Sequence, residues 1–209
     1  MLLITMNKRK LDNYLVKSDD KIVEKINLPQ VSYHNPANND TIYIIDNRIV
    51  FHSTVHTETI QKLFEYVRMI ITSPNFNNYD NRVYIHIVSL GGLITSLIEF
   101  ISIKNNYYSN YEFVSVIENN CTDAGFLLAS LCDFRIIKKK SFCNMSPIIT
   151  QNKYWGMFLQ DDNILTNLEF IIQNSKYKVT KEKISKYFSQ NNCWNSRKML
   201  KIGFVDEIV

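Results

Sequence analysis

The chain has 209 residues, of which 45% are hydrophobic and 21% are charged, and its formal net charge is +4. This length and this balance fit one globular domain with at most an extension. The densest basic run, Lys138-Lys139-Lys140, has no aromatic residues interleaved with it, so the composition argues against a nucleic-acid-binding surface.

The four cysteines are spaced unlike a metal site or a disulfide framework. Cys121, Cys132, Cys143 and Cys193 form no C-x-x-C pair and have no paired histidines nearby, so we expect no metal and no cofactor. Three of the four fall in apolar surroundings, as buried reduced thiols do. We therefore expect a reducing intracellular location: host cytoplasm, an organelle or a virion. The abundance of Asn, Lys, Ile, Tyr and Phe suggests an AT-rich coding sequence, as in a virus, a parasite or a reduced organelle genome.

The first 40 residues differ from the rest. They are polar and charged without clear periodicity, so we expect an N-terminal extension or arm over 1–40 and a folded domain over 41–209. The opening MLLITMNKRK has too short an apolar run for a signal peptide. From Thr41 onward, TIYIID and NRIVFH predict two short strands. Thr57 then opens a predicted helix with an apolar stripe.

The segment Val83–Ile103 approaches the length of a membrane span. His86, the pair Gly91-Gly92 and Glu99 interrupt it. We therefore predict a buried strand over RVYIHIVS, a glycine turn and a helix over LITSLIEFISIK, and no transmembrane helix.

The second half continues the alternation of strands and helices. It predicts a strand over EFVSVIE, a turn at Asn119–Thr122, a helix from about Ala124 and a strand around FRIIK. An amphipathic helix follows at 157–175, and two final helices lead to the terminal strand GFVDEIV. Strands that alternate with crossover helices predict an α/β fold with a largely parallel sheet covered on both faces.

The chain has only five glycines, so each is expected to serve the backbone. Gly91 and Gly92 end one strand and start a helix, where backbone N–H groups could face an oxyanion or a peptide ligand. Gly125 would permit close packing of its helix against a neighbouring strand. Gly203 marks a helix C-terminus.

The order of these motifs carries a resemblance. VYIHIVSLGG at 83–92, CTDAGFLLAS at 121–130 and the final KIGFVDEIV resemble the ClpP family, the proteolytic subunit of Clp proteases, within the ClpP/crotonase superfamily. The resemblance covers roughly residues 41–209. Together with Trp155-Gly156, these motifs look most like those of viral and phage members of the family. It implies repeated βαβ units, a protruding handle helix at about 157–175, and an oxyanion-hole-like group at Gly91, Gly92 and Ala124.

Catalysis in that family uses a serine nucleophile, a histidine base and an orienting aspartate. The resemblance places these three positions at Asp123, Ser146 and Asn191. If the alignment slips by one residue, the positions become Thr122, Met145 and Asn192. All three are substituted in either register, so the resemblance implies a degenerate triad with no catalytic residue.

A structural role is expected for the residues that replace the triad. Asp123 and Thr122 both precede a predicted helix, and both residue types are favoured N-caps. A carboxylate at this terminus gains about 0.3–1 kcal/mol from the helix dipole, and it would repel an oxyanion. His86 is expected to be a hydrogen-bonded strand residue, and Ser146 a turn residue before Pro147. A relocated base at His86 and a nucleophile at Thr122 stay open as weaker alternatives.

The resemblance implies heptameric rings, commonly stacked in pairs. The leading hypothesis is an inactive ClpP-like subunit or assembly factor, with an active ClpP subunit or an AAA+ unfoldase as partner. The chain has no P-loop, and neither nucleic acid nor membrane is expected as a partner. One alternative is a structural or virion-associated scaffold. The other is a crotonase-like enzyme that binds acyl-CoA, because AGFLLASLCDFRII at 124–137 also resembles that pattern.

Overall fold

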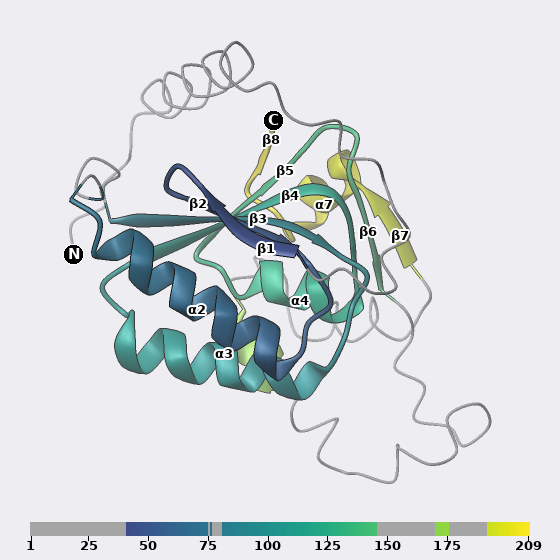
Figure 1. Cartoon of the computed structure of the whole chain (residues 1–209). Helices are drawn as coiled ribbons and strands as arrows, with labels where there is room; N and C mark the ends of the chain where they lie inside the picture. Colours follow the sequence, from purple (N-terminus) through teal and green to yellow (C-terminus); the bar gives the residue numbers. More distant parts are fainter. Residues whose placement is uncertain (1–40, 75, 77–80, 146–169, 176–191) are drawn as a thin grey trace, which may run out of the picture. The chain divides into compact units, whose positions relative to one another are not determined.

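The computed structural model describes residues 41–74, 76, 81–145, 170–175 and 192–209 (Figure 1). The predictions for residues 1–40, for most of the handle helix at 157–175, and for Ser146 and Asn191 lie outside these residues. In the part of the chain that is described, no helix is long and apolar enough to cross a membrane.

Strands and helices alternate along the chain, as predicted for most elements. The strands are β1 (Thr41–Ile45), β2 (Arg48–His52), β3 (Arg82–Ser89), β4 (Glu112–Thr122), β5 (Phe134–Ile137), β6 (Phe142–Met145), β7 (Asn192–Asn195) and β8 (Glu207–Ile208). The helices are α2 (Thr57–Ile71), α3 (Ile94–Tyr107), α4 (Asp123–Ser130) and α7 (Ser196–Ile202), and residues 170–174 are also helical. The strands β6 and β7 were not predicted.

The described strands form one eight-stranded sheet. Its main order is β1-β2-β3-β4-β5-β8, and β6 and β7 branch from β4. The pairs β2–β3, β3–β4 and β4–β5 are parallel, and each is connected through a helix, so they are three consecutive βαβ units. The β1–β2 and β6–β7 pairs are antiparallel. The predicted mixed α/β class is confirmed.

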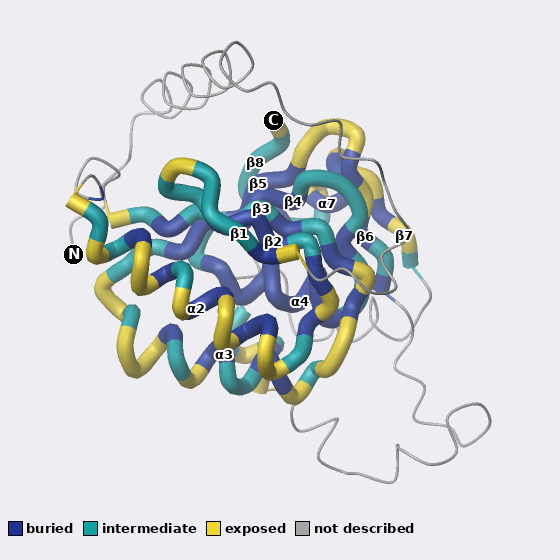
Figure 2. Tube along the Cα trace, viewed as in Figure 1, coloured by how far each residue is buried: buried dark blue, intermediate teal, exposed yellow. Residues whose placement is uncertain are grey.

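The two faces of the sheet differ in the amount of apolar structure that packs against them. Figure 1 shows α2 and α3 side by side along one face, and Figure 2 shows buried positions between these helices and the strands. Residues of β3 alternate strictly, with Val83, Ile85 and Ile87 buried in the main core. On the opposite face, Val114 and its neighbours form only a small cluster. The alternate positions of β3 are only partly buried, and a sheet covered on both faces stays a prediction.

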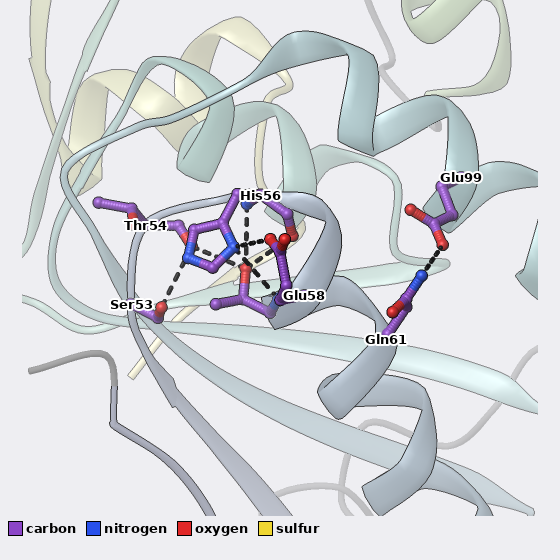
Figure 3. A network of polar contacts seen from close by, with 7 residues as sticks. Ser53, Thr54, His56, Glu58, Gln61 and Glu99 are labelled. Atoms are coloured by element: carbon purple, nitrogen blue, oxygen red, sulfur yellow. Dashed lines mark hydrogen bonds and ion pairs between the residues drawn. The ribbon is translucent and has the colours of Figure 1, made fainter.

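The start of α2 is fixed by local hydrogen bonds. His56 is the N-cap, and its backbone N–H donates to the Thr59 hydroxyl over 3.0 Å. The imidazole Nδ1 lies 2.8 Å from a carboxylate oxygen of Glu58 (Figure 3). These contacts explain why the helix begins at Thr57, as the sequence predicted.

The strand β4 changes partner along its length. Val114–Ile117 pairs with β5, whereas Asn120–Thr122 pairs with β6. Against β3 the register shifts between these two segments. The predicted turn at Asn119–Thr122 is wrong, because the backbone of these residues stays extended and continues the sheet through β6.

Glu118 lies at this change of partner. Its carboxylate is 2.5 Å from His86 Nδ1 on β3 and forms an ion pair with Lys138, which follows β5. Burial by itself would raise the pKa of Glu118, but the hydrogen bonds from His86 and Lys138 outweigh it, and the pKa is lowered from its ordinary value of 4.5. His86 is thus hydrogen-bonded through Nδ1, as expected, while its buried Nε2 has no partner among the described residues. The carboxylate joins β3, β4 and the β5–β6 connection.

We predict that Glu118→Gln lowers the free energy of unfolding at pH 7 by about 1–2 kcal/mol, because the amide accepts weaker hydrogen bonds than the carboxylate. The lowered pKa means that this stabilisation is present above pH 4.5 and is lost as the pH falls below it. Urea unfolding at pH 7 and at pH values below 4.5 measures both effects. The exposed Glu65→Gln serves as control, and an equal loss in the two variants would contradict the role of Glu118.

Candidate functional site

The connection from β4 to α4 is a sharp turn with Asp123 at its apex. Thr122 is extended, with φ −122° and ψ 151°, and Asp123 follows with φ 47°. This left-handed conformation is uncommon for any residue other than glycine, although Asp tolerates it better than most. A strained residue between a strand and a helix is the backbone arrangement that hydrolases of another fold use to expose a nucleophile. Here the residue at the apex carries a carboxylate, and it is half-buried.

The expected capping role is not observed. Thr122 is the N-cap of α4, but its side chain makes no capping hydrogen bond, and Asp123 is the first helical residue. The left-handed Asp123 redirects the chain immediately after Thr122, so the usual capping geometry is not formed. A carboxylate in the first turn still suits the helix dipole.

The glycine turn after β3 packs against two other segments. Gly91 and Gly92 have φ values of 109° and 137°. The Gly91 carbonyl accepts from Val55 N over 2.8 Å, and the Val55 carbonyl accepts from Leu93 N over 2.7 Å. A β-carbon on Gly92 would lie 2.1 Å from the Val55 oxygen, so only glycine fits there. On Gly91 it would lie 3.3 Å from Asp123 Cβ, which places the turn beside the apex.

The proposed oxyanion-hole residues Gly91, Gly92 and Ala124 all belong to this pair of turns. The Gly91 N–H, however, donates to Ser89 Oγ over 3.3 Å. One of the three donors is therefore engaged within the turn itself. Ala124 is buried directly after the apex.

Gly125 brings α4 against β3. A β-carbon at this position would lie 2.4 Å from Ser89 Cβ and 2.6 Å from Ser89 Oγ. The predicted close packing of Gly125 against a strand is confirmed. Because α4 lies directly on the end of β3, the apex and the glycine turn are held together.

The structure brings three of the sequence-predicted triad positions onto adjacent strands. Thr122 on β4 pairs with Asn144 on β6, and Met145 on β6 pairs with Asn192 on β7. Thr122, Met145 and Asn192, the set for the slipped alignment, therefore lie at one end of three neighbouring strands. Asp123 directly follows Thr122 at the same end.

Two further residues at this end were missed by sequence reasoning. The side-chain oxygens of Asn120 and Asn144 are buried and have no hydrogen-bond partner within the part of the chain that is described. Asn120 and Thr122 lie on one face of β4, and Asn144 pairs with Thr122 from β6. The segment FCNM at 142–145 is too short to identify a strand from the sequence. Neutral amides can bind polar groups but do not act as bases.

The thiols near the apex are poor nucleophiles. Cys121 and Cys143 pair in register on β4 and β6, and both are buried. Burial raises the pKa of each well above its usual range, and it raises the pKa of Cys132 to about 12. Cys193 is exposed. In the described ranges, no three His, Cys, Asp or Glu side chains are grouped so that they could hold a metal ion.

Comparison with known proteins supports the fold. No family model and no curated protein matches the sequence. Among solved structures, the chain is similar to the ClpP protease catalytic domain from Plasmodium falciparum, with a TM-score of 0.60 and 15% sequence identity. The match covers 77% of this chain and 83% of that one. At this identity the likeness shows a ClpP-like fold.

We predict that Gly125→Ala destabilises the fold by about 1–3 kcal/mol, because the new methyl group overlaps Ser89. Combining it with Ser89→Gly removes the overlapping atoms and should return about 1 kcal/mol or more of coupling energy in a double-mutant cycle. Chemical denaturation of the four proteins measures the coupling. Simple additivity of the two substitutions would mean that α4 and β3 are not in this close contact.

We also predict that thiol alkylation of the native protein at pH 7–8 modifies Cys193 much faster than Cys121, Cys132 or Cys143, because the last three are buried and protonated. Mass spectrometry after tryptic digestion identifies the modified positions, and the unfolded protein serves as control. Fast labelling of Cys121 in the native protein would show that the apex region opens readily.

Proposed function

We propose that this chain is a catalytically inactive ClpP-like protein that serves as a non-catalytic ring subunit or assembly factor in a Clp-type complex. The observation that carries the proposal is Asp123 at the apex of the strand-to-helix turn. In serine-type hydrolysis a hydroxyl attacks the carbonyl carbon after an imidazole takes its proton. A carboxylate cannot play this part, and its negative charge opposes an oxyanion bound beside it.

The strands next to the apex supply no replacement base. The residues of β6 are Phe, Cys, Met and Asn, and those of β7 are Asn, Cys and Trp. Neither strand carries an imidazole or a carboxylate, and the Cys143 thiol is protonated by burial. Of the described histidines, His52 ends β2, His56 caps α2 and His86 is bonded to Glu118. These assignments support loss of the acid–base machinery with retention of the fold.

The assembly role comes from the resemblance in sequence and from the similarity in fold. We propose a heptamer-like ring, formed by this chain alone or together with an active ClpP subunit, to which an AAA+ unfoldase would dock. A reducing compartment suits four free cysteines, of which three are buried. A viral or phage-type source remains part of the proposal.

Co-expression tests the assembly directly. The full chain would be produced with an active ClpP subunit in a host that lacks its own ClpP, and the complexes would be examined by native mass spectrometry. Mixed rings support the proposal. A chain that stays monomeric, in neither a ring of its own nor a mixed one, would contradict the ring role. Stabilisation by acyl-CoA in a thermal-shift assay would favour a crotonase-like enzyme instead.

We predict that the purified chain neither reacts with a fluorophosphonate probe nor cleaves fluorogenic peptides, and that Asp123→Ser leaves it inactive. The substitution restores a hydroxyl but supplies no base to activate it. The control is an active ClpP subunit from the same ClpP-deficient host. Turnover by the unmodified chain would disprove the proposed inactivity, and Thr122→Ala and Ser146→Ala would then locate the nucleophile.

A further inference from the structure

A basic surface lies where the loop after β5 meets the start of α7. The Ser196 hydroxyl donates to the Lys139 carbonyl over 2.8 Å, and Asn195, the N-cap of α7, pairs with Phe142 at the start of β6. Figure 1 shows this loop and α7 side by side. We define the basic surface by the exposed cations of the two segments: Lys139, Lys140, Arg197, Lys198 and Lys201.

The chain does not neutralise the five cations of the basic surface. Within the described residues none of them makes an ion pair, whereas Lys138 next to them is paired with Glu118. The Asp206 carboxylate, which precedes β8, is bonded to the Arg135 guanidinium over 2.9 Å. Glu207 on β8 offsets at most one further charge, so the surface keeps a net positive charge. Such a surface attracts an anionic partner.

The exposed side of α7 places its cations around an apolar side chain. Arg197, Leu200 and Lys201 have the spacing of one helix face, and Leu200 is 42% exposed. Met199 and Ser196 are buried on the other side of the helix. An exposed leucine between cations suits a partner that offers carboxylates together with an apolar side chain, because each group then meets its complement.

The size of the basic surface fits a short segment of a protein. The seven residues of α7 span about 10 Å, and we take the loop after β5 to add roughly as much. An extended chain rises by about 3.3 Å per residue, so a segment of about six residues covers this length.

We propose that the basic surface binds an acidic segment of a partner protein. Asp and Glu carboxylates of the segment accept charge-assisted hydrogen bonds from Arg197 and from the lysines, and an apolar side chain of the segment packs on Leu200. Met145 and Asn192, two of the triad positions of the slipped alignment, pair at the other end of β6 and β7. Binding at the basic surface is therefore independent of the proposed inactivity and of ring formation.

The test is fluorescence anisotropy of two hexapeptides titrated with the full chain, each carrying the same uncharged fluorophore. The acidic probe is acetyl-Glu-Asp-Leu-Glu-Asp-Glu-amide, and the neutral probe has Gln for each Glu and Asn for each Asp. At about 50 mM salt we expect saturable binding of the acidic probe, at least about tenfold tighter than that of the neutral probe, and loss of most of this difference at about 0.5 M salt. Equal affinity for the two probes would overturn the proposal.

Charge reversal locates the binding. The double variant Lys140→Glu/Arg197→Glu changes one exposed residue in each segment, and an acidic residue in the first turn of α7 suits the helix dipole. We expect acidic-probe binding to weaken by about tenfold, because each exposed ion pair contributes about threefold. The matched control is Lys62→Glu/Arg68→Glu on α2, with the same change in net charge. Circular dichroism checks that both variants fold, and equal losses in both would mean non-specific attraction and would refute the proposal.

The apolar contact is tested by a change in the probe. Serine in place of leucine in the acidic probe should weaken binding by about threefold, because the partial burial against Leu200 is lost. An unchanged affinity would contradict the packing on Leu200.

A nucleic acid is the competing polyanion, since its bases can stack on Phe142, which is 38% exposed beside the basic surface. A labelled thymidylate hexamer is therefore titrated in parallel. Tighter binding of this hexamer than of the acidic probe, with the same loss in Lys140→Glu/Arg197→Glu, would assign the surface to nucleic acid and show the proposal to be wrong.

Discussion

The end of β3 lies so close to the start of α4 and to the segment after β2 that two positions cannot carry a β-carbon. Gly92 meets the backbone of Val55, and Gly125 meets the side chain of Ser89. These contacts hold the glycine turn beside Asp123 and fix the direction in which α4 leaves the sheet. The arrangement of the apex thus depends on packing rather than on capping, because the Thr122 side chain makes no capping hydrogen bond.

The change of pairing partner along β4 provides the second constraint. The strand must leave β5 and join β6 within a few residues, and the Glu118 carboxylate connects His86 and Lys138 at that point. The extended chain then runs directly into the left-handed Asp123. The structure thus has a sharp strand-to-helix turn with an aspartate at its apex.

Strong periodicity made much of this fold predictable. The apolar stripe of α2, the strand–glycine–helix order around Gly91 and the small residues of α4 each dictate one local structure. The segments β6 and β7 were missed, because four residues carry too little pattern and their pairing is set by distant segments. The conformation of Asp123 was also missed, since left-handed backbone is imposed by tertiary contacts and Asp is equally common in caps. Asn120 and Asn144 become candidates only once β6 is seen beside β4.

The pairing of β7 has a consequence for the order of folding. The βαβ units from β2 to β5 join neighbouring segments, so their contacts are local and form early. β6 and β7 are separated by all of residues 146–191, and β8 reaches back to β5 from still further along the chain. Pairing between segments so far apart in sequence is slow, because bringing them together costs chain entropy before any contact forms. During synthesis the sheet from β1 to β5 can form first, and the region around Asp123 is completed last, once residues 192–209 have emerged.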